Sequence, residues 1–250
     1  SSTHAISDAY NLIRLGKGKV FVTGGSEAAI NEAGVGGFNS LQALSTRNDD
    51  PSTASRPFDK DRDGFVIGEG AGALILEEYE HAVNRGARIY CEIRGTGMTA
   101  DAYHLTAPHP EGLGARKVME AALKDGNIDP SEVDYINVHG TATPLGDIAE
   151  TKAIIEVFGD HSYKMNISST KSMTGHLLGG TGAIEAIASI LAIQNGIVPP
   201  TINHFTADPG LDPKLNLTFN KAQKRAVRGA LSKTFGFGGH NACVILKAFE

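Results

Sequence analysis

The chain has 250 residues, which is enough to bury a full hydrophobic core in one large or two smaller domains. Its formal net charge of −5 comes from interspersed acidic and basic residues without a run of like charges, which argues against a nucleic-acid or membrane-surface function. No apolar stretch approaches the roughly 20 residues that span a bilayer.

Strand-like and helix-like patterns alternate along the chain. Helices are expected at residues 7–15, 37–44, 79–85, 115–124, 147–158 and 182–194. Strands are expected at residues 19–23, 64–78, 89–96, 133–138, 167–169, 230–234 and 242–249, and long loops at 45–60 and 99–114. This alternation predicts a layered α/β fold.

Two histidines stand where an apolar strand runs into a glycine-rich turn. His139 follows the strand at 133–138, and His176 ends the motif Ser-Ser-Thr-Lys-Ser-Met-Thr-Gly-His. Ligands collect at the carboxyl ends of strands in open α/β folds, so both histidines are candidates for one site. Lys171 precedes His176 by five residues, and a nearby ammonium group disfavours the imidazolium form. The pattern therefore favours neutral imidazoles that donate N–H groups to a developing oxyanion.

The two cysteines, Cys91 and Cys243, each fall within an expected strand. Because they are far apart and lack CxxC spacing, buried reduced thiols are favoured over a disulfide or a metal site. The glycine clusters at 68–72 and 179–182 lack the spacing of nucleotide-binding loops. No metal or cofactor is therefore expected.

An internal repeat indicates duplication. Residues 65–76 align without gaps on residues 235–246, with Phe, Gly, Ile and Leu at matching places, and residues 12–20 resemble residues 190–198. The second copy has a glycine-rich elbow before its helix, whereas the helix of the first copy begins almost at Ser1. We therefore predict a duplicated fold whose N-terminal repeat is truncated.

A series of motifs resembles the β-ketoacyl-acyl-carrier-protein synthase family of the thiolase-like fold, most closely its type II, elongating members. The motifs are Ser-Thr-His-Ala-Ile at 2–6, Gly-Val-Gly-Gly-Phe at 34–38, Ala-Leu-Ser-Thr-Arg-Asn at 43–48, Ser-Arg-Pro-Phe-Asp at 55–59, Asp-Gly-Phe-Val at 63–66, His-Gly-Thr-Ala-Thr-Pro at 139–144, the His176 motif, and Phe-Gly-Phe-Gly-Gly at 235–239. They run in order across nearly the whole chain. The resemblance implies a layered αβαβα fold, with the remainder of an N-terminal repeat at 1–86 and a C-terminal repeat at 87–250.

The same resemblance implies an acyltransferase that carries out a decarboxylative Claisen condensation. An acyl chain passes from acyl carrier protein to a cysteine; malonyl-carrier protein then loses carbon dioxide, and its carbanion attacks the acyl thioester. By position, His139, His176 and Lys171 match the family's catalytic residues.

The resemblance also assigns supporting roles. Phe235 matches the residue that gates the pocket, and its backbone N–H is a candidate oxyanion donor. Glu185 matches a buried glutamate that needs a partner such as a lysine, either in a structural pair or supporting the site. Thr141 and Thr143 either bond the pantetheine arm or close their own turn.

The family's nucleophilic cysteine has no counterpart in this chain, because its position lies immediately upstream of Ser1. We therefore expect the C-terminal three-fifths of a synthase, inactive by itself. The implied partners are acyl carrier protein, acyl and malonyl thioesters and a second copy in a homodimer, with no cofactor beyond the carrier's pantetheine arm. The implied location is cytoplasmic, with organellar targeting upstream of Ser1 left open.

Three other functions compete with this one. The first is a non-condensing partner subunit of the chain-length-factor kind, although such partners commonly lack the histidine pair. The second is a polyketide ketosynthase. The third is a thiolase, which would need a second cysteine at a C-terminal turn, where this chain has Phe-Gly-Phe-Gly-Gly-His.

Overall fold

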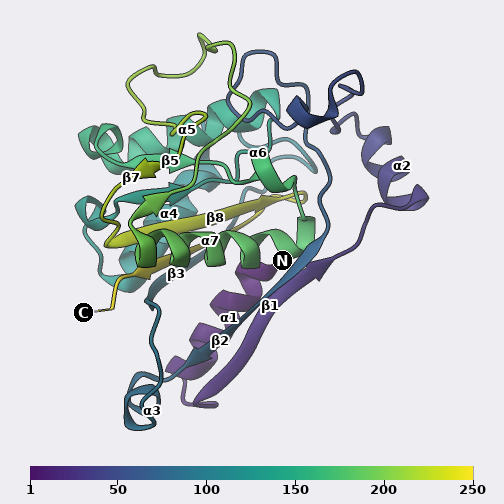
Figure 1. Cartoon of the computed structure of the whole chain (residues 1–250). Helices are drawn as coiled ribbons and strands as arrows, with labels where there is room; N and C mark the ends of the chain where they lie inside the picture. Colours follow the sequence, from purple (N-terminus) through teal and green to yellow (C-terminus); the bar gives the residue numbers. More distant parts are fainter. Residues whose placement is uncertain (250) are drawn as a thin grey trace.

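A computed structural model describes residues 1–249 of the chain. Its centre is a five-stranded sheet in the order β3-β9-β8-β4-β5 (Figure 1). The strands are β3 (Glu92–Ala100), β4 (Tyr135–Asn137), β5 (Asn166–Ser168), β8 (Gly229–Gly236) and β9 (His240–Lys247). β4 is parallel to both of its neighbours, whereas β9 is antiparallel to β3 and β8. β4, β5 and nearly all of β8 and β9 are buried, and the buried positions include polar residues such as Asn137, Ser168 and Lys233.

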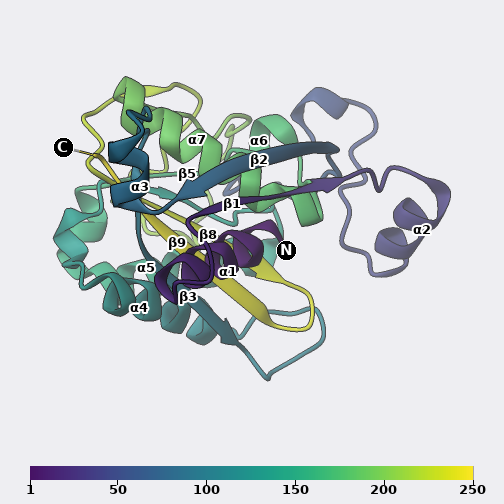
Figure 2. The same cartoon turned by 90° about the horizontal axis from the view of Figure 1, so that it is seen from below.

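Helices cover both faces of this sheet, and a second sheet adds a further layer. α4 (Leu113–Gly126) packs on β3 and β9 and against α5 (Pro144–Phe158). On the other face, α1 (Ser2–Arg14) and α7 (Thr181–Asn195) lie between the large sheet and the β1–β2 ribbon (Figure 2). The layers confirm the predicted thiolase-like α/β architecture.

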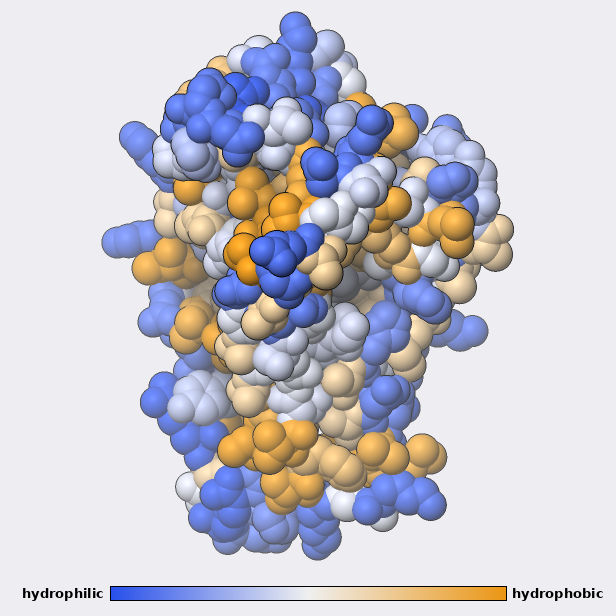
Figure 3. Space-filling view, turned by 90° about the vertical axis from the view of Figure 1, so that its right-hand side faces the viewer, coloured by the Kyte–Doolittle hydropathy of each residue, from blue (hydrophilic) through white to orange (hydrophobic). Residues whose placement is uncertain are grey.

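The outer face of the two-stranded ribbon is apolar and exposed. β1 (Val20–Glu27) pairs antiparallel with β2 (Gly70–Glu77), and neither pairs with another strand among residues 1–249. Val22 and Ile75 are register partners and are 76% and 69% exposed. Figure 3 shows apolar side chains gathered across the lower part of the molecule, at the level where Figure 1 places this ribbon. None of the helices in the described chain is long and apolar enough to cross a membrane.

The remaining elements are short. They are α2 (Glu32–Ser40), α3 (Tyr79–Asn84), α6 (Lys171–Thr174), β6 (Ile197–Val198), β7 (Gln223–Lys224) and the 3-10 turns Pro51–Thr53, Pro130–Glu132, Gly159–Tyr163 and Leu178–Gly180. α2 projects from the body and buries none of its residues (Figure 1).

Several predicted boundaries were wrong. The first helix starts at Ser2 rather than residue 7, and α2 starts at Glu32 rather than residue 37 because the Asn31 side chain caps it. The glycines at 24 and 25 do not end β1; they pair with β2, where a Cβ on Gly24 would lie 2.0 Å from the Gly72 carbonyl oxygen. Cys91 lies just before β3 rather than inside it.

The predicted duplication is visible in strand register. β2 and β9 occupy residues 70–77 and 240–247, as the gap-free alignment requires. In the first pair Val20 faces Glu77 and Glu27 faces Gly70; in the second, Gly229 faces Lys247 and Gly236 faces His240. The two antiparallel pairs therefore share one register over their whole length.

Candidate active site

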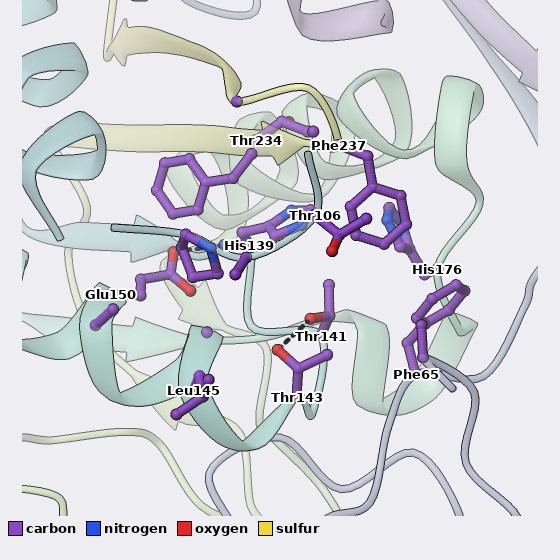
Figure 4. Close-up of a pocket in the computed structure, with 18 of the residues that line it drawn as sticks. Phe65, Thr106, His139, Thr141, Thr143, Leu145, Glu150, His176, Thr234 and Phe237 are labelled. Carbon is purple, nitrogen blue, oxygen red and sulfur yellow. Dashed lines mark hydrogen bonds between the residues drawn. The ribbon is translucent and has the colours of Figure 1, made fainter. Parts of the chain in front are cut away.

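Segments from both ends of the chain enclose a cavity of about 1100 Å³. Its walls include Ser1 beside the start of α1, Phe65 before β2, His139 after β4, His176 after α6 and Phe237 in the β8–β9 turn. Figure 4 shows how these elements converge on one space. The cavity lies at the carboxyl ends of β4 and β8, where a ligand site was expected.

The two histidines predicted from their turns meet in this cavity. The ring centroids of His139 and His176 are 5.2 Å apart, and the ring planes are nearly perpendicular at 87°. Both side chains reach the same space in Figure 4. Each ring also has an aromatic neighbour: Phe235 lies 5.5 Å from His139, and Phe65 lies 5.4 Å from His176, measured between ring centroids.

Backbone contacts select the tautomer of His176. The Leu178 N–H donates to His176 Nδ1 at 3.3 Å, and the Thr181 hydroxyl lies 2.9 Å from the same atom. Because Nδ1 accepts a hydrogen bond, the neutral ring carries its proton on Nε2. In His139, Nδ1 is buried without a hydrogen-bond partner among the described residues, so Nε2 is the ring nitrogen that can meet a ligand.

A carboxylate holds the turn that carries His139. Glu150, in α5, accepts the His139 N–H on Oε1 and the Gly140 N–H on Oε2, both at 2.7 Å. Gly140 has a φ of +37°, and its carbonyl accepts the Ser169 hydroxyl at 2.6 Å. A Cβ at this position would lie 2.8 Å from the Cβ of Ser169, so only glycine fits the turn.

Lys171 and Glu185 form a buried ion pair behind the histidines. The lysine ammonium donates to Glu185 Oε1, which confirms that the buried glutamate has the partner its environment requires. Neither residue is part of the cavity wall. Lys171 therefore does not face the space that the two histidines share, but its charge reaches both imidazole rings.

Burial and nearby cations both favour neutral histidines. Burial lowers the pKa of His139 well below its usual value, and the charges of Lys171, His176 and Lys233 lower it further. The pKa of His176 is lowered for the same leading reason, with Lys171 second. Lys171 was expected to be the main cause, but desolvation is the larger effect. Burial also raises the pKa of Glu185 to about 7.

The other predicted residues surround the histidine pair. Thr141 and Thr143 line the cavity, and their hydroxyl oxygens are 3.3 Å apart (Figure 4). Phe235 also lines it, at the end of β8. Cys91 and Cys243 are not part of the cavity wall, and burial raises the pKa of each thiol to about 12. No group of three or more metal-binding side chains occurs within residues 1–249.

Sequence reasoning missed several residues of the site. Glu150 and Lys233 are both buried and 3.2 Å apart, and neither was singled out because an isolated charged residue in a helix or strand usually faces solvent. Phe65 could have been found, because the repeat alignment places it opposite Phe235.

Comparison with known proteins places the chain in a family. The model of the β-ketoacyl synthase N-terminal domain matches residues 1–82, and that of the C-terminal domain matches residues 90–205. The chain belongs to the β-ketoacyl synthase family. It is 54% identical to 3-oxoacyl-[acyl-carrier-protein] synthase 2 of Synechocystis sp. (strain PCC 6803) over 252 aligned residues and 50% identical to that of Staphylococcus aureus (strain COL) over 250. Both alignments include the whole chain and 60% of the relative, so the chain spans about three-fifths of their length.

Solved structures give the same result. A β-ketoacyl synthase from Burkholderia phymatum superposes with a TM-score of 0.94 at 41% identity, covering 100% of this chain and 60% of that one. A ketosynthase in complex with its type II polyketide acyl-carrier protein superposes with a TM-score of 0.96 at 40% identity, covering 99% of this chain and 60% of that one. The thiolase-like ketosynthase fold expected from the sequence is thereby confirmed.

Proposed function

We propose that the chain supplies the histidine half of an elongating β-ketoacyl-acyl-carrier-protein synthase, which condenses a malonyl thioester with an enzyme-bound acyl chain. The observation that carries this proposal is the pair of neutral imidazoles whose rings lie 5.2 Å apart in one cavity. Two neutral imidazole rings, each able to donate one N–H group, suit a reaction in which negative charge develops on one oxygen.

The chemistry divides into two steps, decarboxylation and condensation. The malonyl group loses carbon dioxide as its C–C bond breaks, and the electron pair moves onto the thioester oxygen as an enolate. His139 and His176 donate to that oxygen and stabilise the charge. The enolate carbon then attacks the acyl thioester carbonyl, a C–C bond forms, and the nucleophile's thiolate leaves.

The proposed nucleophile is a cysteine immediately before Ser1 in the full-length protein. Ser1 lines the cavity and α1 begins at Ser2, so the helix N-terminus meets the same space as the histidines. A thiol at a helix N-terminus has a lowered pKa and attacks thioesters readily. Cys91 and Cys243, which are absent from the cavity wall, do not fill this role.

Partners and pathway follow from the same proposal. Acyl carrier protein would deliver both thioesters through its pantetheine arm, with Thr141 and Thr143 on the cavity wall as candidate contacts, and Phe235 at the gate. The proposal also includes that the full-length protein forms a homodimer and is located in the cytoplasm. The 54% and 50% identities to 3-oxoacyl-[acyl-carrier-protein] synthases support fatty-acid elongation.

Polyketide condensation is the second candidate. It is favoured by the TM-score of 0.96 to a ketosynthase whose structure holds a hexaketide. The two candidates share the histidine chemistry and differ in the acyl chains that the full-length protein accepts. Competition between saturated acyl-carrier and β-keto-acyl-carrier substrates distinguishes them.

The decisive experiment measures carbon dioxide release from malonyl-carrier protein by the full-length protein. His139→Ala and His176→Ala should each lower the rate by a factor of about 10² to 10³, because each removes one preorganised donor. His81→Ala, on α3 and outside the cavity wall, serves as a control. Full activity in both single variants would contradict the proposal.

A further inference from the structure

Lys233 is a fully buried lysine that the proposed reaction does not use directly. It lies on β8 with 0% of its surface exposed. Its ammonium is 3.2 Å from Glu150 Oε1, 3.5 Å from the Met119 sulfur and 5.4 Å from the centroid of the Phe235 ring. An ammonium in such a place is costly unless it is paired, so the carboxylate is its essential partner.

Glu150 connects this lysine to the catalytic turn. Its Oε1 receives both the Lys233 ammonium and the His139 N–H, while its Oε2 receives the Gly140 N–H. A carboxylate accepts hydrogen bonds on both oxygens, which matches the two consecutive backbone N–H groups that Glu150 receives. Glu150 is only 2% exposed, so its charge is compensated by a protein group rather than by solvation.

We propose that Lys233 is a positioning residue, which pairs with Glu150 so that this carboxylate holds the backbone of His139 and Gly140 and thereby orients the His139 ring. Its place on β8, two residues before Phe235, links the strand that carries the gate to the turn that carries the histidine. The inference rests on the proposed function for its catalytic consequence, while the clamp itself is a property of the folded chain.

The charged groups around His139 define what removal of Lys233 changes. Lys171 and its partner Glu185 lie behind the ring from α6 and α7, His176 lies beside it, and the Ser1 end of α1 faces the same cavity. Lys233 and Glu150 approach from β8 and α5. Burial lowers the pKa of Lys233, which remains paired with Glu150. Removing Lys233 would leave the buried Glu150 carboxylate to hold the turn without this charged partner.

The test compares Lys233→Met with Lys247→Met in the full-length protein. Lys247 is on the neighbouring strand β9, where it pairs with Glu132 at the far end of the sheet, so its loss removes a charge without touching the turn. In Lys233→Met, kcat for malonyl decarboxylation should fall by about tenfold or more while KM stays nearly unchanged. The reason is that the variant changes the orientation of the His139 ring and leaves the substrate-binding contacts in place. Lys247→Met should keep both kinetic constants close to those of the unaltered protein.

Amide hydrogen exchange gives a second measurement that needs no activity. Protection of the peptide containing residues 139–140 should drop in Lys233→Met and stay unchanged in Lys247→Met, and Lys233→Arg should restore part of it. If the unaltered protein releases no carbon dioxide, the proposed function fails, but exchange still decides the role of Lys233. Unchanged exchange and an unchanged kcat in Lys233→Met would overturn the inference.

A double variant covers the case in which Lys233→Met fails to fold. Glu150→Gln with Lys233→Met removes both buried charges and should restore stability. The amide offers one acceptor oxygen where the carboxylate offers two, so the positioning role requires that this stable variant still show low kcat and fast exchange at 139–140. Normal values for both would overturn the inference.

Discussion

Phe65 and Phe235, at matching positions of the two repeats, each place a phenyl ring edge-on against one histidine of the cavity. Phe65 contacts His176, and Phe235 contacts His139. The phenylalanine of each repeat thus packs against a histidine in the second half of the chain. The two phenylalanines lie on the wall of the same cavity, Phe65 before β2 and Phe235 near the end of β8. Both repeats therefore contribute an aromatic residue to the cavity.

The turn at Gly140 gives a direct prediction. Gly140→Ala should lower the free energy of unfolding by about 1–3 kcal/mol, because the new Cβ would meet Ser169 and Val138 at a φ of +37°. It should also slow malonyl decarboxylation by displacing His139. Gly36→Ala, where a Cβ meets open space on α2, is the matched control. Denaturant unfolding and carbon dioxide release measure the two effects, and equal stability of both variants would contradict the account.

The lowered pKa values of His139 and His176 predict acid sensitivity. In the unfolded chain a histidine binds a proton below about pH 6.5, whereas the folded chain keeps these two neutral. The unfolded state therefore binds more protons in that range, and the free energy of unfolding falls as pH falls. The contribution of these two histidines to the free energy of unfolding is fully present above the pKa of an unfolded histidine, about 6.5, and is lost as the pH falls below it.

His176→Asn tests this linkage. It removes one titrating group, so the loss of unfolding free energy between pH 7.5 and 5.5 should be smaller by about 1.4 kcal/mol than in the unaltered protein. Equal losses in His176→Asn and in the unaltered protein would show that His176 is not held neutral.

The positions of the histidines could be predicted, but not the support around them. Both histidines flank glycine, and His139 directly follows an apolar segment, which is a local pattern; the short helix α6 separates His176 from the strand that was expected to lead into its turn. The 5.2 Å between their rings depends on how β4 and the α6–α7 elbow pack, and spacing in the sequence does not specify that. Lys171 was correctly associated with the pair, yet its charge is secondary to burial, which only the folded structure reveals.

The fold class followed from alternation and motifs, whereas several boundaries did not. β1 continues through Gly24 and Gly25 because these residues pair with Ala73 and Gly72 of β2 across the ribbon. α2 begins early because of a side-chain cap at Asn31, and it persists although it buries nothing. In the sequence, Glu150 and Lys233 resemble ordinary surface charges, and only the packing of α5 near β8 shows that they form a buried pair. The division of the chain between residues 86 and 87 stays a prediction.

The exposed ribbon predicts self-association of the 250-residue chain. Val22 and Ile75 form an adjacent apolar pair on a two-stranded sheet with open edges, a surface that favours contact with a second molecule. Val22→Lys with Ile75→Lys should reduce the concentration dependence of the sedimentation coefficient. Leu105→Lys changes a residue that is equally exposed but lies in a loop, and it should have little effect. Identical sedimentation of all variants would rule out this face as the contact.

The two thiols predict how the chain responds to electrophiles and thioesters. Burial raises the pKa of Cys91 and Cys243 to about 12, so at pH 8 only about one thiol in 10⁴ is ionised, and the thiolate is the reactive form. Iodoacetamide should therefore label both cysteines slowly in the folded chain and rapidly in urea. Incubation of the chain with an acyl-carrier thioester should leave its intact mass unchanged, whereas the full-length protein should gain one acyl group upstream of Ser1. A stoichiometric adduct on Cys91 or Cys243 under native conditions would overturn the proposed position of the nucleophile, because it would place a reactive thiolate where burial disfavours one.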